Sequence, residues 1–411
     1  MRRPLYGWLT ADAISLTGTR LSMLALPWFV LVTTGSATKT GLVALCEMAP
    51  LVALKILGGP IIDRVGARRV SIGCDLASAV TVALIPVLYA AGALSLPLLL
   101  ALVAIGGALR GPGDAAKAAL TPVLVEAAGV PLERATGLSS MVERSATMVG
   151  AAVAGVLIGT IGAPAAIGVD AASFAVCAGV LAWATAGLPR PVATVEETAP
   201  YLAQLREGWD FLRHDRILVA IAVMVTLTNL IDLAFASVLM PVWGHEHAGA
   251  AEVGLFFALW SGASAIGSGL AARWASGLPR YATYLVAFLV AGLPRFAVLA
   301  LGVPLAIVLA VCAVGGFASG FLNPVLGAVE IERIPRPLLG RVGSLMTAAC
   351  YALMPLGGLL GGGLVSALGL SAALLVCGGA YFVVTMLPAA DPTWRELDRR
   401  APIEGPVAPA A

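Results

Sequence analysis

The amino-acid sequence predicts an all-α integral membrane protein. Hydrophobic residues make up 59% of the 411 residues, charged residues make up only 12%, and the mean hydropathy is +0.95. Soluble domains carry about 25% charged residues. A chain with so few charges cannot present a surface that water solvates, so we expect lipid to surround most of it.

Twelve apolar segments are each long enough to cross a bilayer. A hydrocarbon core of about 30 Å needs about 20 helical residues. These segments are expected to be helices, because unpaired backbone groups are costly in hydrocarbon and barrel strands are shorter. In chain order the predicted spans are residues 7–33, 40–62, 70–91, 95–118, 135–161, 165–186, 217–243, 251–273, 281–302, 304–327, 339–367 and 371–388.

The first six spans differ in what interrupts their apolar sequence. The first contains Asp12 and Arg20, but it is too long for a cleavable signal peptide and is interpreted as a membrane helix. The third contains Pro86, which kinks a membrane helix without ending it. The fifth is rich in small residues that permit close helix packing, and the sixth carries Asp170. The second and fourth spans contain charges that are considered below.

The last six spans follow the same pattern. The seventh contains Asp232, and the eighth is charged only near its ends. The ninth contains Pro294 and Arg295, and the sequence suggests no partner for this arginine. The tenth contains Asn323, the eleventh has Pro355 among several glycines, and the twelfth is free of charge.

The basic residues predict the orientation of the chain. Cytoplasmic connections of membrane proteins are enriched in lysine and arginine. Every second connection collects arginines, while the intervening connections hold little besides Lys39. Both termini are therefore expected in the cytoplasm. The arginines on this side are Arg2, Arg3, Arg64, Arg68, Arg69, Arg134, Arg190, Arg206, Arg213, Arg216, Arg280, Arg333, Arg336, Arg395, Arg399 and Arg400.

The longest interruption, residues 188–216, divides the chain into two bundles of six spans, residues 1–187 and 217–390. The last part of this connector predicts an amphipathic helix at the membrane surface. Its apolar side chains recur at helical spacing: Leu202, Leu205, Trp209 and Leu212. Residues 391–411 are expected to form a disordered cytoplasmic tail.

The connection between the second and third spans carries a motif. It reads Gly59-Pro-Ile-Ile-Asp63-Arg64-Val-Gly66-Ala-Arg68-Arg69. It resembles the G-x-x-x-D-R-x-G-R-R signature of the major facilitator superfamily, with Ala67 at one arginine position. The resemblance covers the whole chain and is strongest to the branch of macrolide-efflux and enterobactin-export proteins. It implies two pseudo-symmetric six-helix bundles that rock around a site at the bilayer midplane.

Other stretches support or weaken this resemblance. Residues 15–27, 170–174, 206–212 and 337–342 support it. Antiporters of the superfamily carry G-P-x-x-G-G in the fifth span, whereas this chain has Gly150-Ala-Ala-Val-Ala-Gly155. The missing proline and glycine leave uptake or facilitated diffusion open as an alternative to export.

The resemblance also implies a cytoplasmic gate. We expect Asp63 to contact the N-terminus of the eleventh span near Gly340, beside Arg341, because a helix N-terminus favours negative charge. The expected gate residues are Gly59, Asp63, Arg64, Gly66, Arg68, Arg69, Gly340 and Arg341.

Ionisable residues inside spans cost about 2.5–3.5 kcal/mol each on insertion scales and are functional candidates by default. Spans one, four, seven and ten line the cavity in the superfamily that the chain resembles. The candidates for substrate contact or proton coupling are Asp232, Asp12, Arg20, Glu47, Arg110, Asp114, Asn229 and Asn323.

Asp232 is the first choice for coupling because it lies deep in a cavity helix, and Arg20 is expected near it. Arg110 and Asp114 are four residues apart, so an intrahelical ion pair is the structural alternative for them. Lys55 is expected to find a carboxylate on another helix.

We therefore expect a secondary transporter in the cell membrane that exports an amphipathic organic molecule in exchange for protons. A transport-inactive membrane sensor or scaffold is the alternative of another class. Enzymatic and ATP-driven functions are disfavoured, because GxxxxGK[ST], HExxH and GxSxG are absent from the sequence. The expected partners are a small-molecule substrate and membrane lipid, with no nucleic acid, metal or cofactor besides the proton, and the chain is expected to be a monomer.

Overall fold

The computed structural model describes residues 3–130, 132–186, 201–274, 277–335 and 338–398. Within these ranges the chain forms helices joined by short turns, without a strand. Twelve continuous or interrupted helices are long and apolar enough to cross a membrane. The predicted fold class and number of spans are confirmed.

Six long helices make up the first bundle. Pro27, Pro50, Pro86 and Pro112 lie inside four of them, where neighbouring helices can satisfy the carbonyls that proline leaves free. The long helices are α1 (Arg3–Thr34), α2 (Ala37–Leu57), α4 (Ala67–Ala90), α5 (Leu96–Ala119), α7 (Leu132–Ile161) and α8 (Ala163–Ala184). Two short helices fill connections between them: α3 (Gly59–Val65) and α6 (Thr121–Ala128).

The spans of the second bundle are interrupted more often. Proline begins α14 and α18, and because it has no N–H it breaks the helical hydrogen-bond pattern there. In chain order the helices are α10 (Arg216–Ala234), the π-helical segment η1 (Phe235–Leu239), α11 (Met240–His247), α12 (Ala250–Trp274), α13 (Arg280–Ala291), α14 (Leu293–Ala300), α15 (Leu305–Ser319), α16 (Leu322–Arg333), α17 (Leu339–Ala352), α18 (Met354–Leu368) and α19 (Leu370–Met386).

The connector contains the predicted helix, α9 (Tyr201–Leu212). An ion pair between Glu207 and Arg341 joins α9 to α17. Leu212 is buried while Trp209 is exposed, so the helix has an inner and an outer face. Residues 187–200 of the connector lie outside the described residues.

The predicted disordered tail is wrong for its first residues. After α19 the chain forms two 3-10 helices, η4 (Leu387–Ala390) and η5 (Pro392–Asp398). Trp394 and Leu397 of η5 are buried, and the Trp394 ring lies 5.2 Å from the ring of Tyr284 on α13. This aromatic packing holds η5 on the second bundle. Residues 399–411 lie outside the described residues.

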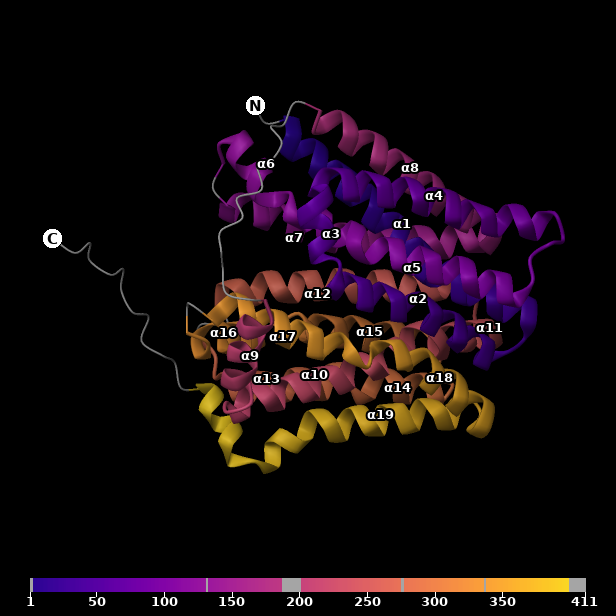
Figure 1. The fold of residues 1–411 in the computed structure, drawn as a ribbon. Helices are drawn as coiled ribbons and strands as arrows, with labels where there is room; N and C mark the ends of the chain where they lie inside the picture. The colour runs from indigo at the N-terminus through magenta and orange to yellow at the C-terminus, as the bar shows by residue number, and fades with distance from the viewer. Residues whose placement is uncertain (1–2, 131, 187–200, 275–276, 336–337, 399–411) are drawn as a thin grey trace.

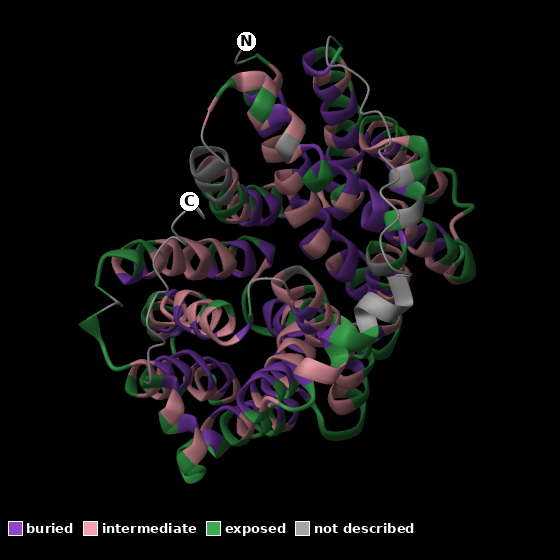
Figure 2. Ribbon diagram, turned by 60° about the vertical axis from the view of Figure 1, so that its left-hand side comes forward, coloured by how far each residue is buried: buried purple, intermediate pink, exposed green. Residues whose placement is uncertain are grey.

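The two bundles lie side by side, with α2 against α18 and α7 against α12. Figure 1 shows the first bundle, indigo to magenta, above the second, pink to yellow. Buried residues gather inside each bundle (Figure 2).

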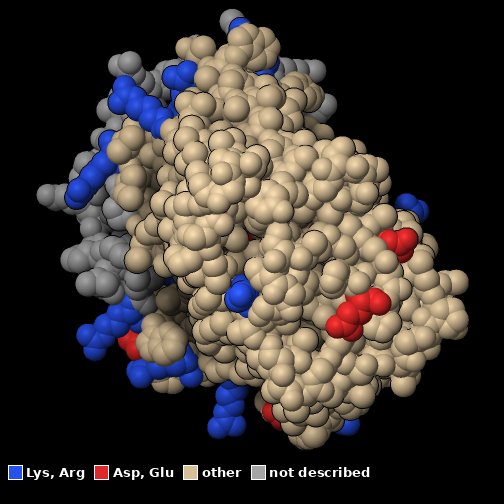
Figure 3. All heavy atoms as spheres, turned by 90° about the vertical axis from the view of Figure 1, so that its right-hand side faces the viewer, with Lys and Arg blue, Asp and Glu red and all other residues tan. Residues whose placement is uncertain are grey.

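The two ends of the molecule differ in charge. One end, which we call the basic end, carries exposed arginines: Arg64, Arg68, Arg69, Arg213 and Arg216. The opposite end, called the far end, contains glycine turns with positive φ at Gly35, Gly92, Gly162, Gly302 and Gly369. Figure 3 looks onto the far end and shows a mostly uncharged surface with scattered charged residues.

Glycines bring the two bundles into backbone contact in the half of the molecule nearer the far end. A Cβ added to Gly41 would lie 2.0 Å from the carbonyl oxygen of Gly358. Where α7 crosses α12, a Cβ added to Gly254 would lie 2.6 Å from the Cα of Gly155. Small residues permit such approaches, and close packing then holds membrane helices together. The far end is therefore closed by direct helix contact.

This crossing predicts a specific sensitivity to one methyl group. Gly41→Ala should force α2 away from α18 and lower stability by about 1–3 kcal/mol, because the opposing atom is rigid backbone. Gly363→Ala on α18 is the matched control, since a Cβ there meets nothing within 4 Å. Unfolding of the purified variants in detergent measures both. Equal stability of the two variants would contradict the role assigned to the crossing.

Candidate functional site

The first bundle contains a sealed ion pair between α2 and α5. Arg110 Nη1 lies 2.6 Å from Glu47 Oε1, and each side chain is only 7% exposed. The two helices approach closely because α5 has Gly107 there; a Cβ on it would lie 2.1 Å from the carbonyl oxygen of Glu47. The alternative pairing of Arg110 with Asp114 is wrong, since Asp114 is exposed and Arg110 turns to the neighbouring helix instead.

The second bundle contains an ion pair that is open on one side. Asp232 on α10 pairs with Arg295 on α14. The arginine side chain is 8% exposed, whereas the aspartate side chain is 40% exposed. The π-helical segment η1 begins three residues after Asp232, and π-helical turns often occur at functional sites.

Four aromatic rings surround Arg295. Its guanidinium carbon lies 4.8–5.0 Å from the ring centroids of Phe235, Trp260, Phe296 and Tyr381. Its Nε is buried and has no hydrogen-bond partner among the described residues. Cation–π attraction to these rings therefore replaces part of the hydration that the cation gives up. The sequence suggested no partner for Arg295, because three of the four rings come from other parts of the chain.

Arg20 does not take the place that we expected beside Asp232. Its Nη1 lies 3.6 Å from Met23 Sδ on its own helix, and its Nε is buried without a hydrogen-bond partner among the described residues. A Cβ added to Gly150 of α7 would lie only 2.8 Å from the Cβ of Arg20, so the two helices are in close contact there. Arg20 thus packs between α1 and α7, while Arg295 supplies the positive charge beside Asp232.

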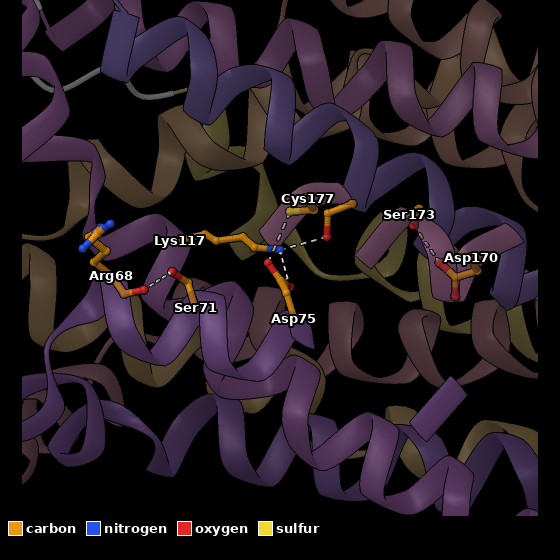
Figure 4. Close-up of polar contacts among 8 residues, drawn as sticks. Arg68, Ser71, Asp75, Lys117, Asp170, Ser173 and Cys177 are labelled. Atoms are coloured by element: carbon orange, nitrogen blue, oxygen red, sulfur yellow. Dashed lines mark hydrogen bonds and ion pairs between the residues drawn. The ribbon is translucent and has the colours of Figure 1, made fainter. Parts of the chain in front are cut away.

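A buried polar network joins four helices of the first bundle (Figure 4). Lys117 Nζ on α5 donates to Asp75 Oδ1 on α4 at 2.9 Å and to Ser15 Oγ on α1 at 2.8 Å. Cys177 on α8 donates its thiol to Asp75 Oδ2 at 3.2 Å. Lys117 was missed by the sequence reasoning, although a lysine one turn after Asp114 in an apolar span was a usable signal. Asp75 is the carboxylate partner of Lys117 within this network.

Further acidic groups lie around this network. Asp12 is partly buried, and it lies within electrostatic range of Lys117, Asp114 and Glu143. Asp114 and Glu143 are exposed. Asp12 thus shares one lysine with several carboxylates, whereas Asp232 has an arginine of its own.

Asp170 forms a second buried carboxylate site in the first bundle. It is 1% exposed and accepts hydrogen bonds from Ser22 on α1 and from Ser173, at 3.2 Å for the latter. Gly18 makes room for it, since a Cβ there would lie 2.4 Å from Asp170 Oδ1. Asp170 was used in the sequence reasoning only as part of a resemblance, yet it fastens α8 to α1.

The remaining coupling candidates have different surroundings. Asn229 Nδ2 donates to the Cys350 carbonyl at 3.0 Å, close to the break between α17 and α18, which is a structural role. Asn323 is exposed in the first turn of α16. Lys55 lies over the ring of Tyr351, 5.6 Å from its centroid, and this contact takes the place of the carboxylate partner that we expected.

The gate motif lies at the basic end. Gly66, with φ of 93°, makes the turn between α3 and α4. Arg68 Nε donates to Thr185 Oγ1 at 2.8 Å and so fastens α4 to the end of α8. Arg64 and Arg69 are exposed, and Gly59 begins α3. The side chain of Asp63 and the surroundings of Gly340 lie outside the described residues, so their contact stays a prediction; Arg341 pairs with Glu207.

A pocket lies between the bundles nearer the basic end. It has a volume of about 520 Å³, and its lining includes Met141 and Met148 of α7 and Pro324 of α16. Beside it, Arg144 Nη1 donates across the bundle interface to Ser268 Oγ at 2.9 Å. Methionine adapts its shape to irregular apolar partners, which suits a variable occupant.

Comparison with known proteins shows which family the sequence matches. Residues 9–249 match the sequence profile of the Major Facilitator Superfamily. The multidrug efflux pump Tap of Mycobacterium tuberculosis (strain ATCC 25618 / H37Rv) is 30% identical over 415 residues, which cover 100% of this chain and 99% of that protein. The protein of the same name from Mycolicibacterium fortuitum is 31% identical over 405 residues and 96% of each chain.

Solved structures share the fold. The crystal structure of the nucleoside transporter NupG superposes with a TM-score of 0.74 at 15% identity, covering 94% of this chain and 98% of that chain. A bacterial homologue of the human lysosomal transporter Spinster, in an inward-facing and unoccupied conformation, superposes with a TM-score of 0.72 at 12% identity, covering 98% and 99%.

The sealed pair predicts a strong coupling between two residues. Glu47→Leu or Arg110→Met alone should lower the free energy of unfolding by about 3–5 kcal/mol, because each leaves an uncompensated buried charge. The double variant should lose less than the sum of the two. Reversible unfolding in mixed detergent micelles measures this double-mutant cycle. Additive losses would mean that the pair contributes nothing as a pair.

Proposed function

The chain belongs to the major facilitator superfamily and is a secondary transporter, and on that premise we propose that it exports amphipathic organic molecules of several kinds in exchange for protons. The observation that carries this proposal is the similarity over the full chain to relatives named multidrug efflux pumps. The half-open pair of Asp232 and Arg295 supports proton exchange, because one carboxylate is accessible and its partner is fixed.

In the proposed coupling step a proton binds Asp232 and a substrate leaves. Protonation removes the negative charge and breaks the ion pair, while the four rings continue to hold the guanidinium of Arg295. The guanidinium of Arg295 thus keeps the same position whether Asp232 is protonated or ionised. A proton and a substrate that favours ionised Asp232 then compete for the same carboxylate, which is the requirement for exchange.

The proposed transport path opens at the basic end, which we assign to the cytoplasm together with both termini. Direct glycine contacts close the far end, and the pocket beside Met141 and Met148 lies nearer the basic end. Substrate would enter there and leave after the bundles rock and separate the far-end crossings. A single chain contains both bundles, so we propose that the transporting unit is a monomer.

The glycine motif of the fifth span, which lacks the proline and one glycine, no longer favours uptake. Gly155 packs directly against Gly254, so the close crossing of α7 and α12 survives without the proline. Export therefore remains the proposed direction.

Asp232→Asn should lose efflux against a gradient, because an amide has no carboxyl proton to release. It should also bind substrate more weakly, as the protonated carboxyl does in the proposed competition. The decisive measurement is substrate-induced proton release from detergent-purified protein near pH 7. Glu126→Gln is the control, since Glu126 is an exposed carboxylate on α6 and is not among the coupling candidates. Proton release from Asp232→Asn equal to that of the unmodified protein would assign coupling elsewhere, first to Asp12.

Cysteine labelling in intact cells tests the orientation. In a background without the six native cysteines, Glu246→Cys at the far end should react with an impermeant maleimide from outside. Glu126→Cys on α6 at the basic end should be protected until the membrane is permeabilised. The reverse pattern would invert the proposed topology.

A further inference from the structure

A groove on the lipid-facing side of the second bundle lies apart from the transport path. It runs between α10 and the end of α19, continues onto η4 and η5, and has a volume of about 640 Å³. Val219, Val223 and Leu227 line one wall at intervals of one helical turn, and Val384 and Leu387 line the other. Val223 and Leu387 are 54% and 61% exposed, so the groove presents apolar surface that no other part of the described chain covers.

The length of the groove corresponds to one leaflet. From Arg216 at the mouth to Leu227 is eleven residues, or about 17 Å along an α-helix. Half of a hydrocarbon core of about 30 Å is about 15 Å. An acyl chain that enters at the level of Arg216 would therefore follow this wall to the middle of the bilayer.

Charges of both signs stand at the mouth. Arg213 and Arg216 line it on one side and Asp391 on the other. Arg213 pairs with Asp210 at 3.0 Å, but both side chains are about half exposed and such a surface pair is weak. Hydrogen bonds from the hydroxyl and backbone N–H of Thr393 lower the pKa of Asp391 below its usual value, so this carboxylate is ionised at neutral pH.

We propose that this groove binds one phospholipid whose head group carries both a phosphate and a primary ammonium, as in phosphatidylethanolamine. The guanidinium groups of Arg213 and Arg216 hold the phosphate, because planar N–H donors match its oxygens. The ammonium donates to the carboxylate of Asp391. A purely anionic head group would leave Asp391 facing a second negative charge, and a quaternary ammonium could not donate a hydrogen bond.

The position of the groove gives the lipid a structural task. It contacts α10, which carries Asp232, and α19, which continues into η5. It also lies at the start of the second bundle, directly after the connector helix α9. A bound lipid would therefore link α10, α19 and η5 at the basic end.

Native mass spectrometry of the full-length protein, with phosphatidylethanolamine, phosphatidylcholine or phosphatidylglycerol added, tests the proposal. The unmodified protein should retain one phosphatidylethanolamine preferentially. Asp391→Asn should reduce its preference over phosphatidylcholine by about ten-fold, the loss of one charge-assisted hydrogen bond. Glu126→Gln on α6, a basic-end carboxylate of the other bundle, should leave the preference unchanged.

A second pair of variants tests the groove without changing charge. Val223→Trp should fill it and remove the retained lipid, whereas Val286→Trp, at a similarly exposed position on α13, should not. Retention of one phosphatidylethanolamine by Val223→Trp would overturn the site. An unchanged preference in Asp391→Asn, or a preference for phosphatidylglycerol, would overturn the recognition of the ammonium. Neither result would bear on proton-coupled export.

Discussion

Hydrocarbon offers no partner for a polar group, and this constraint governs the whole molecule. Backbone groups are satisfied within helices, so the described residues form helices joined by short turns. Ionised side chains must find partners within the protein or at its surface. In the first bundle Glu47 and Arg110 enclose each other, and Lys117 and Asp75 do the same nearer the basic end. Glycine makes the first of these pairs possible, because Gly107 lets α5 lie directly on α2.

The second bundle meets the same constraint differently. Arg295 is buried against aromatic rings, but its carboxylate partner is 40% exposed. The two bundles are therefore alike in fold and unlike in electrostatics: one has a rigid pair with no access, and the other has a fixed cation beside a carboxylate that can be reached. Such an asymmetry suits a protein in which one half serves as support and the other takes part in exchange.

The sequence was sufficient to predict the fold, because insertion into lipid depends on the length and charge of each apolar segment. Both quantities can be read directly from the sequence. The partners of the charged side chains could not be predicted from the sequence. Whether Arg110 faces Asp114 or Glu47 depends on the rotation of α5 and on its contact with α2, which Gly107 determines. Arg295 gains its rings from four helical segments, and no spacing along the chain brings them together. Residues 392–398 were misjudged because their polar composition hides two buried side chains, Trp394 and Leu397.

In the proposed proton exchange, the depth of Asp232 would link transport to the membrane voltage. It is the seventeenth residue of a 32-residue span and so lies close to the middle of the bilayer. A proton that reaches it from either side crosses about half of the electric field, and a full crossing is worth about 2.3 kcal/mol per 100 mV. Because Arg295 keeps its charge in place, the arginine itself moves no charge through the field when Asp232 is protonated. If the exchanged substrate carries no net charge, such an exchange would draw on the electrical part of the proton gradient even when the pH on the two sides is equal.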